Sequence, residues 1–225
     1  MTWLLANLDL VLGLTLDHAR LSVVPILVSL VASVPLGWLA SRHPVPRTLI
    51  LVVAGILFTI PSLALFTSLP AILGTRILDE TNIVVAMSIY GVAVMARGAA
   101  DAFASVPKDV VNAATAVGYS AAGRFWTVEF PLAGPVLLAS LRVVAVSPVS
   151  ILTVGSLIGV QTLGYLFING YQREFPTQIV IGMIFTVLLA LLLDRLLVLV
   201  GTVLMPWTRA APKRRRALRR VEVTS

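Results

Sequence analysis

Long apolar stretches alternate with short polar segments along this chain, and five of the stretches approach the roughly 20 residues that a helix needs to cross a lipid bilayer. The stretches lie at residues 22–40, 49–69, 82–103, 132–158 and 178–204. The pattern therefore predicts an all-α membrane protein with about five transmembrane helices.

The whole chain divides into three parts. Residues 1–19 carry Asp9 and Asp17 and lack the basic start of a signal peptide, so we expect a separate amphipathic or interfacial helix there. Residues 20–206 form the predicted transmembrane domain, because no repeat or linker divides them. Residues 207–225 form a basic tail, which we expect to be cytoplasmic.

Composition supports a lipid environment and excludes several kinds of chemistry. Hydrophobic residues make up 58% of the chain and charged residues 12%, whereas a soluble domain has about 25% charged residues. The sequence has no cysteine and only two histidines, His18 and His43, so we expect no disulfide, no thiolate chemistry and no metal site. It also lacks a Walker A motif, so any bound ATP and magnesium belong to another polypeptide.

Lysine and arginine residues set the expected orientation through the positive-inside rule. They gather after the first and third stretches, at Arg42, Arg47, Lys108 and Arg124, and in the basic tail. We therefore expect the N-terminus outside, the C-terminus in the cytoplasm and an odd number of spans. The net charge of +7 is attributed to topology and lipid headgroups rather than to nucleic-acid binding.

Several spans contain residues that disturb a helix. Proline and small polar residues within a span either permit close helix packing or line a wet translocation path. The candidates for such a path are Pro61, Ser62, Tyr90, Ser147, Ser150 and Thr153. Both interpretations stay open on the sequence alone.

Ionisable residues also interrupt the spans. Arg97 and Asp101 share a helix face near the inner end of the third stretch. Arg142 lies deep in the fourth stretch, so either the helix starts later than expected or Arg142 has a partner. Asp194 and Arg195 in the fifth stretch point to different helix faces. Structural pairing is the preferred interpretation, and an ion or proton path is the alternative.

The segment between the third and fourth stretches, residues 105–131, has helix signals of its own. Pro107 suits the first position of a helix, and Gly118 suits its end. Ser120 can cap a second, aromatic helix over about residues 121–129, and Pro131 ends this unit and opens the fourth stretch. The predicted loop consists of a helix, a glycine turn and a second helix. Its apolar side chains lie in the cytoplasm, and we expect them to bind in a groove of a partner protein.

This loop resembles the EAA loop of permease subunits in binding-protein-dependent ABC importers. The register of that motif is matched by Asn112, Ala113, Ala114, Gly118, Val128, Phe130 and Pro131. The sequence departs from the motif at Asn112, which replaces an acidic residue, and at Val128 and Phe130, which replace aliphatic ones. The resemblance implies that these residues contact a cytoplasmic ABC ATPase, which binds the ATP and magnesium, and that this chain is a non-catalytic subunit.

A second motif, TIPSLAL at Thr59–Leu65, resembles a signature of osmoprotectant permeases, which import glycine betaine, choline or carnitine. Residues 155–159, the pair Leu163 and Gly164, and Arg97 are also similar to those permeases. The resemblance covers residues 20–205. It implies a bacterial cell membrane, a dimer of ATPases, a second permease that is identical or related, and an extracytoplasmic solute-binding protein.

Three other functions were compatible in part with these features. Methionine-type permeases share the EAA loop and a similar five-span core. An ion-coupled secondary carrier would use Arg97, Arg142 or Asp194, although such carriers often contain internal repeats that the sequence does not show. A membrane-embedded enzyme is disfavoured because the sequence shows no nucleophile–base group and no cluster of metal ligands.

Overall fold

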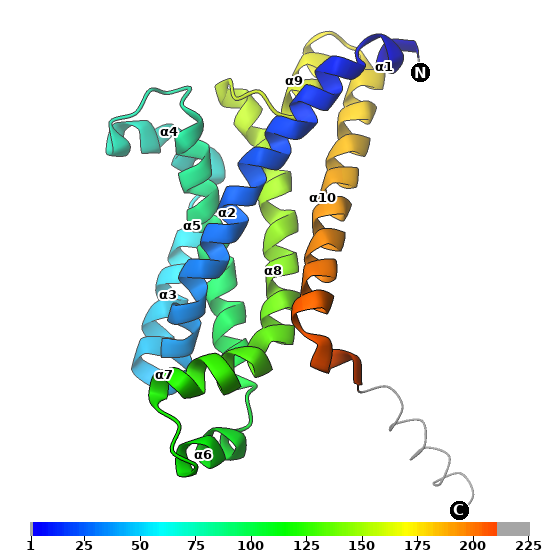
Figure 1. Cartoon of the computed structure of the whole chain (residues 1–225). Helices are drawn as coiled ribbons and strands as arrows, with labels where there is room; N and C mark the ends of the chain where they lie inside the picture. The colour runs from blue at the N-terminus through cyan, green and yellow to red at the C-terminus, as the bar shows by residue number, and fades with distance from the viewer. Residues whose placement is uncertain (1, 211–225) are drawn as a thin grey trace, which may run out of the picture.

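The structure is a computed structural model that describes residues 2–210, and every regular element in that range is a helix (Figure 1). The elements are α1 (Thr2–Ala6), α2 (Leu8–Arg42), α3 (Pro44–Thr59), α4 (Ser62–Leu73), α5 (Glu80–Ala104), α6 (Lys108–Ala116), α7 (Ala121–Arg124), η1 (Phe125–Glu129), α8 (Phe130–Leu152), η2 (Thr153–Ile158), α9 (Gly164–Gln172), α10 (Pro176–Leu204) and η3 (Pro206–Ala210). The predicted all-α fold is confirmed. Most of the predicted basic tail, from residue 211 onward, lies outside the described residues.

Within residues 2–210, four helical segments are long and apolar enough to cross a membrane: α2, α5, the continuous stretch Ala121–Ile158 and α10. The number becomes five if the bent pair α3 and α4 forms one span. Each predicted stretch therefore corresponds to one segment. The third and fifth stretches agree closely with α5 and α10, whereas the fourth ends in the tighter 3₁₀ helix η2.

The first transmembrane helix begins earlier than the sequence indicated. α2 starts at Leu8, so residues 8–19 continue this helix and only Thr2–Ala6 are separate, as α1. Asp17 and Arg20 do not interrupt the helix because their backbone N–H and C=O groups still form its hydrogen bonds. With 35 residues α2 is about 52 Å long, which exceeds the roughly 30 Å hydrocarbon layer and leaves room for polar turns beyond it.

The second predicted span, residues 49–69, is not one straight helix. α3 ends at Thr59, and α4 is bent by 99° from it. Pro61 has no N–H donor and disfavours a helical conformation at Ile60, which is extended with ψ at 127°. The hydroxyl of Tyr90 donates a hydrogen bond to the carbonyl of Ile60. Lipid has no donor for this carbonyl, so the hydrogen bond from Tyr90 satisfies it.

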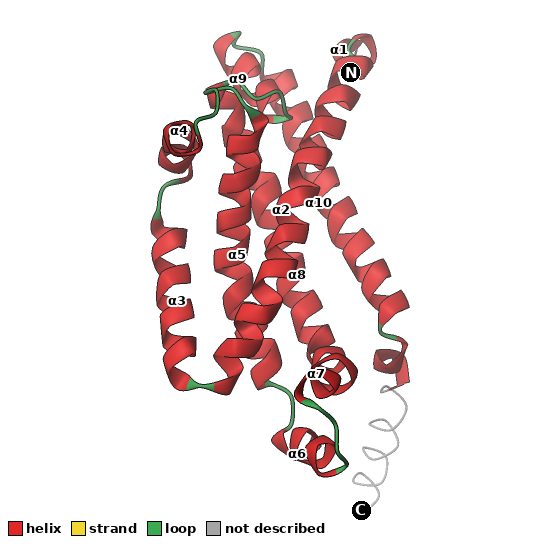
Figure 2. Ribbon diagram, turned by 60° about the vertical axis from the view of Figure 1, so that its left-hand side comes forward, coloured by secondary structure: helices red, strands yellow, loops and turns green. Residues whose placement is uncertain are grey.

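Close packing of α2 on α5 forms the centre of the bundle, and α3 and α10 lie at its two sides (Figure 2). Gly37 of α2 permits this approach, because a Cβ atom there would lie 2.4 Å from Cβ and 2.5 Å from the carbonyl carbon of Ala99 on α5. Small residues let transmembrane helices gain van der Waals contact that larger ones would block. Met95 and Phe103 of α5 continue the core toward α8.

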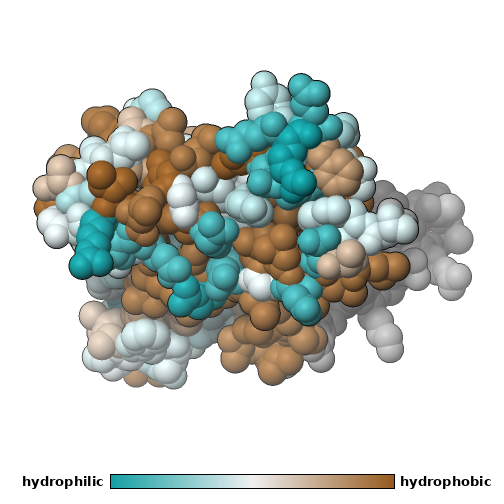
Figure 3. All heavy atoms as spheres, turned by 90° about the horizontal axis from the view of Figure 1, so that it is seen from above, coloured by the Kyte–Doolittle hydropathy of each residue, from teal (hydrophilic) through white to brown (hydrophobic). Residues whose placement is uncertain are grey.

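The two ends of the bundle differ in structure. α1, α4 and α9 lie at one end, and α6 and α7 lie at the other (Figure 1). Viewed from the end with α4 and α9, hydrophilic and hydrophobic side chains are intermingled (Figure 3). An exposed ion pair joins Arg20 of α2 to Glu80 of α5, with 2.5 Å between Nη2 and Oε2. Such a pair fits an aqueous boundary rather than hydrocarbon.

We predict that Gly37→Ala destabilises the bundle, because the new methyl group meets Ala99 backbone that cannot rotate away. We expect the free energy of unfolding to fall by about 1–3 kcal/mol, as in proteins with overpacked cores. Gly13→Ala is the matched control in the same helix, since a Cβ atom there meets nothing within 4 Å. Thermal unfolding of the purified protein in detergent measures both, and equal melting temperatures would contradict the packing argument.

Candidate functional site

α6 projects from the bundle and contains no buried residue (Figure 1). Asn112 and Ala113 are exposed on it, and Ala114 is half-buried. Two apolar side chains are exposed here, Val110 at 41% and Val117, at the end of the helix, at 80%. The helix therefore presents an apolar surface that its own chain leaves largely uncovered.

The turn after α6 depends on Gly118, whose φ is +95°. The N–H of Gly118 donates to the carbonyl of Thr115 at 3.0 Å, and the N–H of Tyr119 donates to the carbonyl of Ala114 at 3.1 Å. These two hydrogen bonds form a Schellman motif, which favours glycine because other residues are strained at positive φ. The predicted helix end at Gly118 is confirmed.

The second helix of the loop starts where the sequence predicted but does not end there. The Ser120 hydroxyl accepts a hydrogen bond from the N–H of Gly123 at 3.1 Å, as expected of an N-cap. η1 then adds one π-helical segment, and the chain enters α8 without a break. Pro131 therefore lies in the first turn of α8, where a missing N–H is tolerated. Similarly, Pro107 caps α6, which begins at the next residue.

The structure separates the predicted coupling residues into two groups. Asn112, Ala113 and Ala114 lie on the exposed α6, whereas Val128, Phe130 and Pro131 lie at the junction with the membrane domain. Aromatic rings fill this junction, where Phe125 packs against Trp38, Phe103, Trp126 and Phe130 with centroid distances between 4.8 and 5.9 Å. Phe130 of the second group is thus part of the aromatic packing at the base of the loop, whereas the first group lies on the helix that projects from the bundle.

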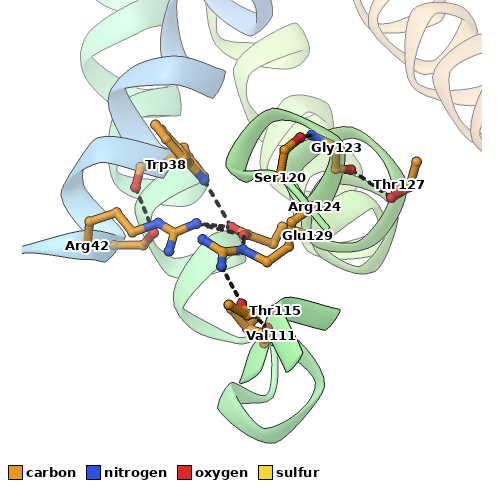
Figure 4. A network of polar contacts seen from close by, with 10 residues as sticks. Trp38, Arg42, Val111, Thr115, Ser120, Gly123, Arg124, Thr127 and Glu129 are labelled. Atoms are coloured by element: carbon orange, nitrogen blue, oxygen red, sulfur yellow. Dashed lines mark hydrogen bonds and ion pairs between the residues drawn. The ribbon is translucent and has the colours of Figure 1, made fainter. Parts of the chain in front are cut away.

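A buried carboxylate connects the loop to the bundle (Figure 4). Glu129 is 4% exposed and accepts hydrogen bonds from Trp38 Nε1 at 2.9 Å and from Arg124 Nε at 2.8 Å. Nη2 of Arg42 donates to both of its oxygens, at 2.6 and 2.7 Å. Nη1 of Arg124 also donates to the hydroxyl of Thr115 on α6 at 2.6 Å. One continuous polar network therefore joins α6, the base of α8 and the end of α2.

The electrostatics of this network favour the charged form of Glu129. This residue is the ninth of the 38-residue stretch Ala121–Ile158, whose length of about 57 Å leaves its first turns outside a hydrocarbon layer of roughly 30 Å. Burial opposes ionisation, but hydrogen bonds from Arg124 and Trp38 and the positive charge of Arg42 outweigh it and keep the pKa of the carboxyl below its usual value. A lowered pKa in the folded state stabilises the fold above the unfolded pKa. That stabilisation is lost as the pH falls through the folded value.

This network is not predicted from the sequence. There, Arg42 and Arg124 count only as charges for the positive-inside rule, and Glu129 is only a position inside the motif. One signal was available, because a glutamate between aromatic residues in a positively charged loop needs a cationic partner. Which arginines supply it depends on the arrangement of α2 and the loop.

The predicted path residues are brought together only in part. Tyr90 and Ser147 line one small cavity between α5 and α8, which Phe58 of α3 also lines. Pro61 adjoins this region through the hydrogen bond from Tyr90 to Ile60. Ser62 opens α4, and Ser150 and Thr153 lie where α8 passes into η2. None of these three side chains lines the cavity.

The intramembrane charges pair differently from the expected neighbours. Asp101 pairs with Arg47 of α3, at 2.7 Å, rather than with Arg97 on its own helix. Arg142 has the partner that its depth required, since it forms two hydrogen bonds with Asp194 of α10. Structural pairing is therefore confirmed for Arg142 and Asp194.

These features define a class, a polytopic helical membrane protein with a helix-turn-helix loop held outside its spans. Residues 33–210 match the family of the binding-protein-dependent transport system inner membrane component, and the chain belongs to that family. It is 30% identical to the osmoprotectant import permease protein OsmW of Salmonella typhimurium, over 91% of this chain and 96% of the relative. It is 29% identical to the choline transport system permease protein OpuBB of Bacillus subtilis, over 85% of this chain and 87% of the relative.

Two further comparisons extend this result. The chain is 31% identical to the ergothioneine transport permease/ergothioneine binding protein EgtU of Helicobacter pylori, over 74% of this chain but 30% of that longer relative. An inward-facing structure of the MetNI methionine ABC transporter superposes with a TM-score of 0.72 over 89% of this chain and 97% of the other, at 20% identity. The structural likeness shows that the two chains share a fold.

We predict that Glu129→Gln destabilises the protein, because it leaves Arg42 and Arg124 close together without their shared counter-charge. The expected loss is about 3 kcal/mol, typical of breaking a buried ion pair. Asp101→Asn is the control, since its pair with Arg47 is exposed on both sides and is worth less than about 1 kcal/mol. Melting temperatures at neutral pH compare the two variants, and an equal decrease would contradict the role assigned to Glu129.

Proposed function

We propose that this chain is the membrane subunit of an ABC importer for an osmoprotectant such as glycine betaine, choline or carnitine. The observation that carries the proposal is the likeness to OsmW and OpuBB along nearly the full length of all three chains. The TIPSLAL segment at Thr59–Leu65 supports the same solute class, because it resembles a signature of osmoprotectant permeases. It lies at the break between α3 and α4, beside Tyr90. Methionine is a weaker candidate, since the methionine transporter resembles this chain at 20% identity.

The exposed α6 serves in this proposal as the docking element for a separate ATPase subunit, which binds ATP and magnesium. Its apolar side chains would enter a groove of the ATPase, as an amphipathic helix enters a hydrophobic cleft. Closure of two ATPases would then displace α6. The network from Thr115 through Arg124 to Glu129 and Arg42 would pass that displacement to α2 and α8.

The proposal includes two further partners. A second permease, identical or related, completes the translocation path, because one bundle leaves α10 exposed along nearly its whole length. An extracytoplasmic binding protein delivers the solute, in line with the combined permease and binding protein named for EgtU. The N-terminus, α4 and α9 then face outside, and α6, α7 and the C-terminus face the cytoplasm of a bacterial cell.

Docking through α6 predicts that Ala113→Asp uncouples the transporter, because a charge is placed on the exposed surface meant for an apolar groove. In proteoliposomes with the ATPase and binding protein, we expect solute-driven ATP hydrolysis to fall at least about tenfold, as for an interface anchor worth 1.4 kcal/mol or more. Ala122→Asp on the neighbouring α7 is the matched control and should retain most of the activity. Unchanged coupling in Ala113→Asp would contradict docking through α6.

The proposed orientation can be tested directly, because the natural sequence has no cysteine. Single cysteines are introduced at Ile77, which is 70% exposed between α4 and α5, and at Val117, which is 80% exposed after α6. A membrane-impermeant maleimide added to intact spheroplasts should label Ile77→Cys only, and should label Val117→Cys after the membrane is opened. The reverse pattern would invert the proposed topology.

A further inference from the structure

A groove of about 460 Å³ runs between α8 and α10 on the outer face of the bundle. Its lining residues are Ala139, Arg142, Val143, Val146, Ser147 and Asp194. The residues from α8 recur at three- and four-residue steps, so they form one stripe along that helix. The opposite side of α8, including Val144 and Ala145, is buried in the bundle core.

The ion pair in this groove is held in a fixed geometry. Arg142 donates from Nε to Oδ1 of Asp194 at 2.6 Å and from Nη2 to Oδ2 at 2.9 Å. This bidentate arrangement orients the planar guanidinium. The Arg142 side chain is 44% exposed, whereas that of Asp194 is 16% exposed, so the cation is the more open partner.

The depth of the pair excludes hydrocarbon as its natural surroundings. Arg142 lies about 18 Å along α8 from Phe130, near the middle of a helix of 23 residues. Charged side chains at that depth pair with one another and face a bundle interior or a water-filled cavity, because exposure to lipid is costly. Since Arg142 stays 44% exposed on the outer face of this bundle despite its partner, we place the groove on the translocation path that the proposed second permease would complete.

The guanidinium retains unused donors toward the groove. Nε and Nη2 are engaged with Asp194, and Nη1 has no partner in the described part of the chain. A guanidinium presents five N–H donors in a planar fork that matches a carboxylate. Asp194 can thus hold the group in place while the remaining edge of Arg142 binds a second anion.

We propose that Arg142 binds the carboxylate of a zwitterionic solute during its passage, with Asp194 as the positioning residue. The proposal rests on the proposed function, since glycine betaine and carnitine each carry a carboxylate and a quaternary ammonium group. Ser147 lines both this groove and the neighbouring cavity between α5 and α8. That cavity has a volume of about 10 Å³, which is too small for a quaternary ammonium group, so only the carboxylate of the solute is assigned to the groove.

Two solutes that differ in the carboxylate test this assignment. Glycine betaine has a carboxylate and choline does not, while both have the same trimethylammonium group. The variant Arg142→Gln/Asp194→Asn removes both charges together, so neither is left unpaired, and the amides can still hydrogen-bond to one another. ATP-driven uptake of each solute is measured in proteoliposomes that contain the permease, the ATPase and the binding protein.

We expect the double variant to lose glycine betaine uptake by about tenfold or more, the scale of one charge-assisted contact, and to keep choline uptake within about twofold. An equal loss of glycine betaine uptake and choline uptake would show that the Arg142–Asp194 pair has only a structural role, and would overturn the proposal. Unchanged uptake of both would overturn it equally.

A binding measurement separates this proposal from the proposed function. If the unmodified transporter imports neither solute, the proposed substrate class is wrong. Glycine betaine should still raise the melting temperature of the unmodified permease and not that of the double variant, because a ligand stabilises the state to which it binds. No rise in the unmodified permease would overturn the carboxylate site.

Discussion

The position of the loop relative to the transmembrane helices depends on the ion pairs that the buried carboxylate of Glu129 forms with Arg42 and Arg124. α6 buries none of its own residues, so apolar packing alone does not fix its position. Charge-assisted hydrogen bonds do so, because Arg42 comes from the end of α2, Arg124 comes from the loop, and Arg124 also holds Thr115 on α6. Without that carboxylate, two guanidinium groups would lie close together without a counter-charge. The loop is therefore tied to two transmembrane helices at one point.

α8 connects this point to the rest of the molecule. Glu129 lies directly before its first turn, Arg142 lies near its middle, and Ser147 lies where the groove meets the aromatic cavity. In the proposed function, a displacement of the loop would therefore act on the same helix that lines the proposed path. Coupling to the ATPase and passage of the solute would then both depend on α8.

Local rules account for what the sequence predicted correctly. Gly118 ends α6 because a Schellman turn needs positive φ, and Ser120 starts the next helix because its hydroxyl accepts from a free N–H. Pro61 interrupts the second span for an equally local reason. Pro131 opens the fourth span as expected, because a missing N–H is tolerated in the first turn of a helix. The predicted start of the first span was wrong, because the polar residues after Leu8 do not by themselves break a helix.

The sequence by itself determined the membrane class, the approximate spans and the register of the coupling loop, because apolar length, turn residues and motif spacing are properties of neighbouring residues. Only the tertiary structure decided which charges meet. Glu129 pairs with Arg42, 87 residues away in the sequence, and Arg142 pairs with Asp194, 52 residues away. Asp101 is close in sequence to Arg97 and yet pairs with Arg47 on another helix. Ion pairs in a bundle follow the positions of packed helices, and those positions result from contacts such as Gly37 on Ala99 that no single segment contains.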